Sequence, residues 1–401
     1  MKWVFLLGSP DISGGTYVIF EHAIRAMKNG DDVYILTEES IDKSRLDWHS
    51  EAKKLSWITY DDLANYHFDV AIATWWKTIY SLHLVESKNY LYFVQSIESK
   101  FYPEFEKPLQ QLVESTYALD LPTITEATWI KEYLKMEYDN NVYLAFNGTR
   151  KDLYHKDIVP IKKRTKGKLR VLVEGPLSVS FKNVEKTISL CRKSEADEIW
   201  LLTSSKVESY KGVDKIFSQV PIEETGAIYR SCDVVIKLSY VEGMFGPPLE
   251  MFHCGGTAIV YDVTGHDEYI VHNKNAIVIK RDDEKKVIQA INRLKKDEEF
   301  LDSLKAEARI TAEDWISWEE SSNIFYQQVY EIVNKNVFNR KRLKSQTEFH
   351  MKSYIVFEQF VTKNYKLLFQ KTLFQVKEKI KHKLPYIFSI SKKILYYFKM
   401  K

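Results

Sequence analysis

Short apolar runs alternate with segments of helical periodicity along the first half of the chain. The apolar runs cover residues 2–8, 32–37, 68–75, 90–95, 122–125 and 142–146, and a helical pattern over 16–29 follows Gly14-Gly15. Runs that are apolar throughout, rather than at every second position, are typical of strands buried on both faces. We therefore predict a parallel sheet covered by helices, starting with a strand–glycine loop–helix–strand unit.

The same alternation restarts after a polar, basic stretch at residues 147–168. Apolar runs cover 169–173, 199–202, 215–220, 234–238, 258–263 and 276–279, and helical patterns cover 183–193, 222–231, 282–312 and 315–336. Asp282 or Asp283 is the expected N-cap of the third of these helices. Two alternating halves predict two doubly wound α/β domains, with ligands bound where the carboxyl ends of their strands face each other.

These patterns predict five segments. They are a first Rossmann-like domain (1–150), a linker (151–167), a second Rossmann-like domain (168–315), a long helix crossing back to the first domain (316–338) and a tail (339–401). A chain of 401 residues is long enough for two such domains and an extension.

Composition favours a reducing, cytoplasmic setting. The only cysteines are Cys191, Cys232 and Cys254, too few and too scattered for a disulfide framework or a zinc ribbon. The apolar start of the chain is short for a signal peptide, and no run of about 18 apolar residues occurs. We therefore interpret the glycosylation-like Asn147-Gly148-Thr149 as a chance match.

Charge separates the tail from the rest of the chain. Residues 339–401 carry 16 Lys and Arg against 3 Asp and Glu, whereas residues 1–338 have a net charge of −10. Mixed lysines, aromatics and aliphatics predict basic amphipathic helices that bind an anionic membrane surface, with Pro385 between two of them. The alternatives are a helical hairpin packed on a partner or on the first domain, and nucleic-acid binding, which the acidic remainder disfavours.

The segment from Glu242 to Glu250 carries the clearest candidate chemistry. It follows an apolar run, contains Gly243 and Gly246, and enters a predicted short helix with Pro248 at its first position. Free N–H groups near residues 245–249 would suit a diphosphate, and the two carboxylates would accept hydrogen bonds from sugar hydroxyls beside it. The alternative is an ordinary strand–loop–helix turn with a glutamate that complements the helix dipole.

Glu242 to Glu250 resembles the E-x7-E signature of retaining GT-B glycosyltransferases, and Phe245-Gly246-Pro247-Pro248-Leu249-Glu250 resembles glycosyltransferase family 4. Other similar segments are Cys254-Gly255-Gly256-Thr257, Val263-Thr264-Gly265-His266-Asp267-Glu268 and Asn147-Gly148-Thr149 before Tyr154. Tyr92-Phe93-Val94-Gln95 and Phe101-Tyr102-Pro103 are similar to a rhamnosyltransferase-like branch. The resemblance covers residues 1–335 and implies the GT-B fold, a nucleotide-sugar donor and a glycan or lipid-linked acceptor.

The resemblance also implies roles for individual residues. Glu242 would contact the donor sugar, Glu250 the ribose, and Lys182 the leaving diphosphate. The remaining donor-site candidates are Gly15, Gly175, Phe245, Gly246, Pro247, Pro248 and Leu249, and Gly14 would face the acceptor. The chain departs from the family at Pro176, where an arginine is usual, so we expect a substitute cation such as Lys237 or Arg150.

The acceptor side departs from the family as well. Gln95, with Glu98 nearby, stands where a histidine is usual, and a glutamine cannot act as a general base. A front-face retaining mechanism, in which the departing phosphate oxygen takes the acceptor proton, tolerates this change. Trp75 is either an acceptor-side residue at a strand end or part of the core.

No metal or other cofactor is expected. The chain has no D-x-D motif and no H-E-x-x-H motif, and we interpret His22, His83 and His253 as structural or surface residues.

We therefore predict a retaining, metal-independent glycosyltransferase of surface-polysaccharide biosynthesis, peripheral on the inner face of the cell membrane. The alternatives are a GT-B sugar-nucleotide epimerase, which would use Glu242 and Lys182 for the same donor, and a non-catalytic scaffold tethered to a membrane.

Overall fold

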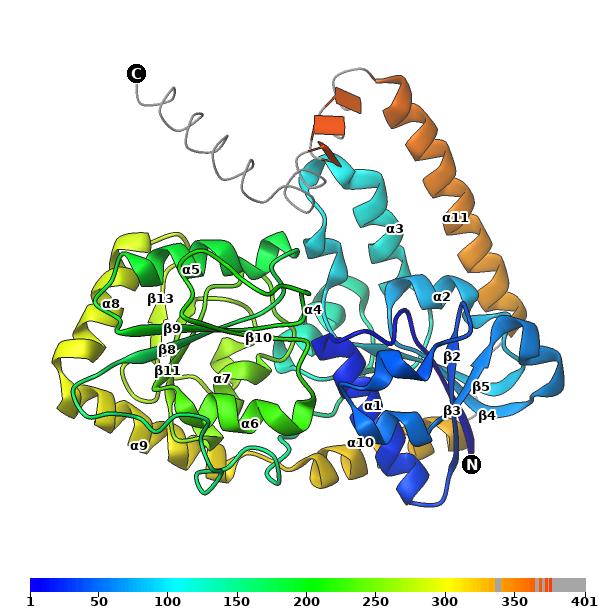
Figure 1. Ribbon diagram of the computed structural model, residues 1–401. Helices are drawn as coiled ribbons and strands as arrows, with labels where there is room; N and C mark the ends of the chain where they lie inside the picture. The colour runs from blue at the N-terminus through cyan, green and yellow to red at the C-terminus, as the bar shows by residue number, and fades with distance from the viewer. Residues whose placement is uncertain (336–339, 365–367, 370–371, 374, 377–401) are drawn as a thin grey trace.

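The computed structural model describes residues 1–335, 340–364, 368–369, 372–373 and 375–376, and shows two lobes side by side (Figure 1). Each lobe is built on one parallel sheet, so the predicted fold of two doubly wound α/β domains is confirmed. The first sheet contains β1 (Lys2–Leu6), β2 (Asp32–Thr37), β3 (Ser56–Thr59), β4 (Phe68–Ala73), β5 (Ser87–Val94), β6 (Thr123–Thr125) and β7 (Val142–Leu144). The second contains β8 (Arg170–Glu174), β9 (Glu198–Thr203), β10 (Lys215–Ser218), β11 (Val234–Lys237), β12 (Thr257–Tyr261) and β13 (Ile277–Ile279).

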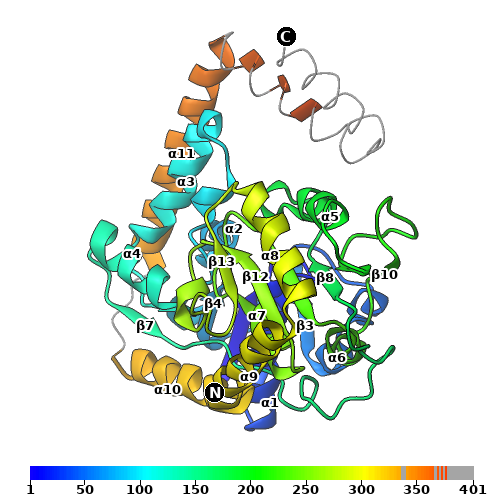
Figure 2. The same ribbon diagram turned by 90° about the vertical axis from the view of Figure 1, so that its left-hand side faces the viewer.

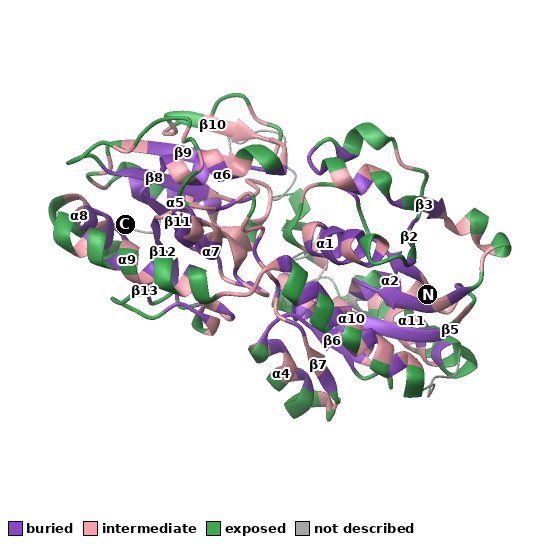
Figure 3. Ribbon diagram, turned by 90° about the horizontal axis from the view of Figure 1, so that it is seen from below, coloured by how far each residue is buried: buried purple, intermediate pink, exposed green. Residues whose placement is uncertain are grey.

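In the first sheet the strand order is β3-β2-β1-β4-β5-β6-β7, and every pairing is parallel. Both faces are buried, as Figure 3 shows. Trp3 and Phe5 of β1 pack on one face, against α1 (Gly14–Lys28) and α10 (Trp318–Lys335). Val4 and Leu6 pack on the other, towards α2 (Trp76–Leu82), α3 (Lys107–Tyr117) and α4 (Thr128–Tyr138). Strands covered on both sides explain the continuous apolar runs in the sequence.

The second sheet has the order β10-β9-β8-β11-β12-β13 and is also parallel throughout. Helices α5 (Val184–Arg192) and α8 (Glu284–Lys296) bury their apolar sides on one face. On the other face lie α6 (Ile222–Ser231) and α7 (Gly246–His253), and α9 (Glu298–Asp314) packs into the core on the α5 face with its first half and into the core on the α6 face with its last half. Because all strands are parallel, their carboxyl ends gather at one edge of each sheet, where ligands bind in open α/β folds.

Helix α10 follows the second lobe in the chain but packs on the first. Its buried Trp318, Phe325 and Val329 belong to the same core as β1 and α1. At its start Ser317 bridges to Thr149, and the Gly148 backbone lies so close to Ser317 that a Cβ would collide there. The α10 segment therefore ties the end of the second lobe to the first.

Helix α11 (Arg340–Lys363) rises beside α3, as Figures 1 and 2 both show. Leu343 is buried between α11 and the first lobe, whereas Phe349, Val356, Phe357 and Phe360 are exposed. None of the helices in the described parts of the chain is long and apolar enough to span a membrane. Pro385, and the helices predicted on either side of it, lie outside the described residues.

The sequence patterns missed two features. Strand β3 has polar ends and only one fully buried side chain, Ile58, because it is the edge of its sheet. The single helix predicted over 282–312 is two helices, since Asp297 ends α8 and its side chain caps α9 by accepting from the Phe300 N–H at 3.0 Å. Asp283, one of the two expected caps, starts α8.

Replacing Phe325 by alanine should destabilise the first lobe. The side chain is 2% exposed and would leave a cavity between α10 and the sheet, which typically costs roughly 3–5 kcal/mol. Denaturant unfolding checks this. Ile324→Ala, at a 38% exposed site on the same helix, is the control and should cost under about 1 kcal/mol. Equal losses of unfolding free energy in Phe325→Ala and Ile324→Ala would contradict the packing of α10 on the first sheet.

Candidate functional site

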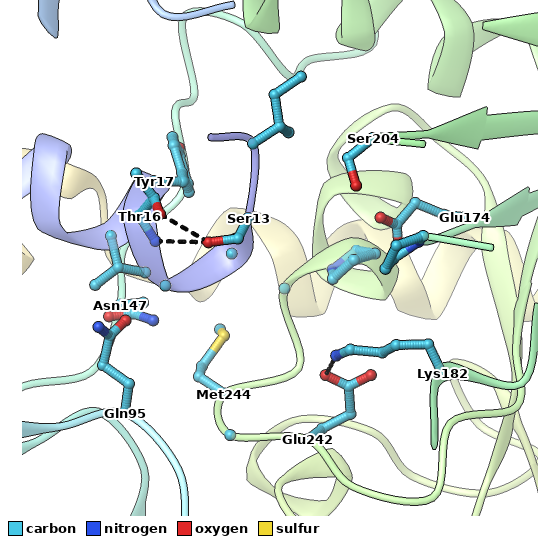
Figure 4. Close-up of a pocket in the computed structure, with 18 of the residues that line it drawn as sticks. Ser13, Thr16, Tyr17, Gln95, Asn147, Glu174, Lys182, Ser204, Glu242 and Met244 are labelled. Atoms are coloured by element: carbon cyan, nitrogen blue, oxygen red, sulfur yellow. Dashed lines mark hydrogen bonds and ion pairs between the residues drawn. The ribbon is translucent and has the colours of Figure 1, made fainter. Parts of the chain in front are cut away.

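A cavity of about 760 Å³ lies between the lobes, at the carboxyl ends of both sheets. The first lobe contributes the loop after β1, the start of α1 and the residues after β5 and β6. The second contributes the ends of β8 and β11, Lys182, and the segment from Val241 into α7. Figure 4 shows side chains from both lobes pointing into the same space. The predicted location of the site is therefore where the structure has its large cavity.

Two lysines and two glutamates form a charge cluster on the second-lobe wall of this cavity (Lys182, Glu242, Lys237 and Glu174), in which Glu242 and Lys237 are buried and the other two are half-buried. Lys182 Nζ lies 2.7 Å from Glu242 Oε2, as drawn in Figure 4, and Lys237 Nζ lies 3.9 Å from Glu242 Oε1 and pairs with Glu174. Burial opposes ionisation of Glu242, but the two lysines outweigh it and its pKa lies below the ordinary value. The charge cluster therefore keeps Glu242 ionised.

Lys237 ends β11 in the middle of the second sheet and is 3% exposed. Burial alone would lower the pKa of Lys237, but the nearby Glu174 and Glu242 together raise it by more. The pKa of Lys237 therefore lies above the ordinary value. Lys237 is thus a charged lysine on the cavity wall near Pro176, where the family usually has an arginine. Arg150, the other expected substitute, does not line the cavity, because it pairs with Asp152 and Glu21 instead.

Helix α7 begins at Gly246, two residues before the predicted Pro248, with Phe245 as its N-cap. Pro247 and Pro248 both lie in its first turn and have no N–H, and the Gly246 N–H is used by the Met244 carbonyl at 3.1 Å. This terminus therefore has fewer free N–H groups than predicted.

Glu250 lies in the second turn of α7 rather than the first, and it lines the cavity. Gly246, Pro247 and Leu249 line it too, but Phe245 and Pro248 are buried in the core behind α7 and do not. Gly175 does not line the cavity either, although its φ of 135° shapes the turn after β8.

The start of α1 is a second candidate for binding an anion. Ser13 caps this helix through the Thr16 N–H, so Gly14 and Gly15 form its first turn instead of the predicted loop. Their N–H groups have no intrahelical acceptor, and both residues line the cavity. The sequence patterns did not identify Ser13 as a helix cap, because the glycines after it were interpreted as a turn. A serine directly before a helical pattern is the signal that would have indicated this cap.

On the acceptor side, Gln95 and Trp75 both line the cavity. Gln95 faces Gly15, and Trp75 lies against Gly8, so closely that a Cβ on Gly8 would collide with the ring. Of the aromatics quoted from this region, Tyr92 and Phe93 are buried in the core.

Glu126 is the main site residue that the sequence did not indicate. It follows β6 of the first lobe, and its two carboxylate oxygens accept from the Met244 N–H at 3.1 Å and from Asn147 Nδ2 at 2.8 Å. Gly243 allows this contact, since a Cβ there would collide with the Gln95 carbonyl oxygen. The loop between Glu242 and α7 is thus held from the opposite lobe.

The cavity has more carboxyl groups than cations, and burial offsets the excess. Burial raises the pKa of Glu98 to about 8 and that of Glu126 to about 7. Burial, with Glu174 nearby, raises the pKa of Glu250 to about 7. Near neutral pH these three groups are largely or partly protonated, which reduces their repulsion of an anionic ligand.

Among the residues that the structure describes, no group of three or more His, Cys, Asp and Glu side chains is arranged to hold a metal ion. His22 is buried in the first core, where burial lowers its pKa to about 3, and burial lowers the pKa of His253 to about 4.

Residues 193–311 match the sequence model of the family described as glycosyl transferases group 1. This segment contains β11, Glu242 and α7, so the match covers most of the second lobe and one wall of the cavity. The fold of about four fifths of the chain matches GT-B glycosyltransferase structures. One is Anabaena Alr3699/HepE in complex with UDP and glucose, with a TM-score of 0.66, 13% identity, and coverage of 82% of this chain and 100% of that one.

Two further similarities come from bacterial glycan biosynthesis. WaaG, a glycosyltransferase involved in lipopolysaccharide biosynthesis, has a TM-score of 0.61 at 12% identity over 78% of this chain and 95% of its own. The O-antigen biosynthesis protein RfbC of Myxococcus xanthus is 25% identical over 222 residues, which are 52% of this chain. The aligned part is 17% of RfbC, so this chain corresponds to a small part of that relative.

The raised pKa of Glu250 predicts a pH-dependent stability. A carboxyl group with a pKa of about 7 in the folded state and about 4.5 when unfolded stabilises the fold below pH 4.5 and loses this contribution as the pH rises through 7. Glu250→Gln should flatten the fall in unfolding free energy between pH 5 and 8 (urea titrations at each pH). Glu299→Gln, at an exposed site on α9, is the control and should leave the profile unchanged.

Proposed function

We propose that the protein is a retaining glycosyltransferase of the family 4 type. It transfers a sugar from a nucleotide-diphosphate sugar to a glycan or a lipid-linked glycan in surface-polysaccharide biosynthesis. The observation that carries the proposal is the charge cluster at the cavity wall, of which Lys237 and Glu242 lie in the segment that matches the group 1 model. RfbC and WaaG support the choice of pathway, and the UDP and glucose bound by HepE support the class of donor.

The donor is proposed to lie along the second lobe with its diphosphate directed at the start of α1. The Gly14 and Gly15 N–H groups donate to the diphosphate, and Lys182 and Lys237 neutralise the charge that develops on it as the sugar leaves. Glu250 accepts from the ribose hydroxyls. Glu242 Oε1, which has no hydrogen-bond partner among the described residues, accepts from a sugar hydroxyl.

The acceptor is proposed to enter from the first lobe, past Gln95 and Trp75. Gln95 has no basic group, so it positions the acceptor by hydrogen bonds and takes no proton. The departing phosphate oxygen takes the proton on the same face of the sugar, which gives retention. Because the two lysines meet the phosphate charge, we propose no metal. The similarity of residues 92–95 to a rhamnosyltransferase-like branch makes a deoxyhexose one candidate for the sugar.

A thermal-shift screen with nucleoside diphosphates and nucleotide sugars tests donor binding. A ligand at 100 times its dissociation constant should stabilise the protein by about 2.7 kcal/mol. The paired variant Lys182→Met/Glu242→Gln removes two opposite charges together, and should reduce the shift by at least half because the diphosphate loses a cation. Lys285→Ala, an exposed lysine on α8, should not change it.

Three results would contradict this proposal in different ways. The absence of a thermal shift with every nucleotide would contradict the proposed donor site. An unchanged shift in the paired variant would show that the charge cluster does not contribute to donor binding. Donor turnover without an acceptor would indicate the epimerase instead.

We also propose that the protein acts in the cytoplasm, on the inner face of the cell membrane, through the basic tail from residue 339 onwards. Helix α11 supports this, since it carries exposed Phe349, Val356, Phe357 and Phe360 on a helix with an excess of lysine and arginine. Exposed aromatics on a basic helix suit the interface of an anionic bilayer.

Phe357→Ser/Phe360→Ser should weaken binding to vesicles containing an anionic phospholipid by at least about tenfold, since two apolar side chains no longer enter the interface. Co-sedimentation with anionic and with neutral vesicles measures the effect. Met136→Ser/Val159→Ser, at exposed sites away from α11, is the control. Equal binding of all three proteins would exclude this face of α11.

A further inference from the structure

A second pocket, of about 410 Å³, opens at the edge of the cleft between the lobes. Its first-lobe side consists of residues between Ser99 and Glu114, which include the start of α3. Its second-lobe side consists of Tyr240, Val241, Thr264 and Arg281. The function proposed above does not use this pocket.

Three cations line the second pocket: Lys100, Lys107 and Arg281. None of the three forms an ion pair within 4.0 Å in the described parts of the chain. Lys100 Nζ lies 5.1 Å from the ring centres of Trp129 and Tyr133, so aromatic faces rather than carboxylates hold it. Burial, and to a smaller extent the nearby Arg281, lower the pKa of Lys100.

The remaining polar groups fit a ligand that combines negative charge with hydroxyls. Glu104 and Glu114 also line the pocket, so the cations exceed the carboxylates by one. Ser99 and Thr264 add hydroxyl groups from the two lobes. Lysine and arginine bind phosphate oxygens, and carboxylates accept from sugar hydroxyls, so a phosphorylated sugar matches this mixture better than a nucleic acid or an acidic peptide.

The second pocket is adjacent to the main cavity. Val241 lines both, and Phe101, which directly follows Lys100, lines the main cavity. The Phe101 ring stacks on Phe181 of the other lobe with centres 4.7 Å apart, and Phe181 directly precedes Lys182. A ligand in the second pocket therefore lies beside the aromatic pair that borders the transfer site.

We propose that the second pocket binds the phosphate or diphosphate group of the acceptor, with Lys100 and Arg281 as its main contacts. This inference rests on the proposed transferase function, because it assigns an anionic acceptor to that reaction. The phosphate belongs either to a lipid carrier or to a soluble sugar phosphate. Helix α3 borders the pocket and packs against α11, the helix that we propose to bind the membrane. A lipid carrier held at α11 would therefore reach the pocket.

The test is calorimetric titration of the full chain with inorganic pyrophosphate and with farnesyl diphosphate. The donor site is first saturated with the nucleoside diphosphate that gives the largest thermal shift. Lys100→Ala/Arg281→Ala should weaken binding of both probes by about tenfold or more, because two charged contacts are lost. Its affinity for the nucleoside diphosphate should stay unchanged, which also shows that the variant is folded. Lys296→Ala/Arg309→Ala removes the same charge from exposed residues that line neither pocket and should bind both probes like the original protein.

Equal affinity of Lys100→Ala/Arg281→Ala and the original protein for pyrophosphate would overturn the proposal. If farnesyl diphosphate binds more tightly than pyrophosphate, and the same variant loses this binding, the site is supported and is assigned to a lipid carrier. If the two probes bind equally well and Lys100→Ala/Arg281→Ala loses the binding of both, the site is supported and a soluble sugar phosphate is the source of the phosphate. If no nucleotide binds at all, the same titrations are run without one. Loss of pyrophosphate binding in Lys100→Ala/Arg281→Ala but not in Lys182→Met/Glu242→Gln then supports the second pocket although the proposed donor site has failed.

Discussion

The need to pair buried charges at the ends of β8 and β11 governs the rest of the site. Lys237 ends a central strand, where an unpaired ammonium group would be strongly destabilising. Glu174 and Glu242 provide the opposite charge, and Lys182 completes the charge cluster from the next loop. Glu242 is therefore fixed and ionised before any ligand arrives. A site organised in this way loses little energy to rearrangement when an anionic donor binds.

The two lobes hold the same loop from opposite sides. Glu126 of the first lobe accepts from the Met244 backbone, and Trp129 donates to the Gly243 carbonyl at 3.0 Å. Thr128 adds contacts to Glu268 across the same boundary. The backbone beside Glu242 is thus determined by both lobes, so a change in their relative position would move the sugar-binding carboxylate that we propose. The raised pKa of Glu126 adds a pH-sensitive group to this contact.

The departures from the family pattern have a common physical explanation. Pro176 follows Gly175 where an arginine is usual, and we propose that Lys237 on a neighbouring strand supplies the cation instead. The prolines of α7 remove N–H donors from that terminus, and the glycines of α1 leave theirs available. In both cases the electrostatic requirement of an anionic ligand is met from another element that reaches the same cavity.

Hydrophobic patterning in the sequence determined the two parallel sheets and most of their helices, because strands and helices buried on a core leave a local periodic signal. Local motifs also placed Glu242 and Lys182 in segments that follow strands, and Glu250 in the helix after Glu242. They did not indicate Glu126, the pairing of Lys237 with Glu174, or the second pocket around Lys100 and Arg281, whose members lie far apart in the chain. The break at Asp297 was decided by local capping rather than by periodicity. Periodicity depends on neighbours in sequence, whereas charge pairing and pockets depend on neighbours in space, and only the tertiary structure supplies those.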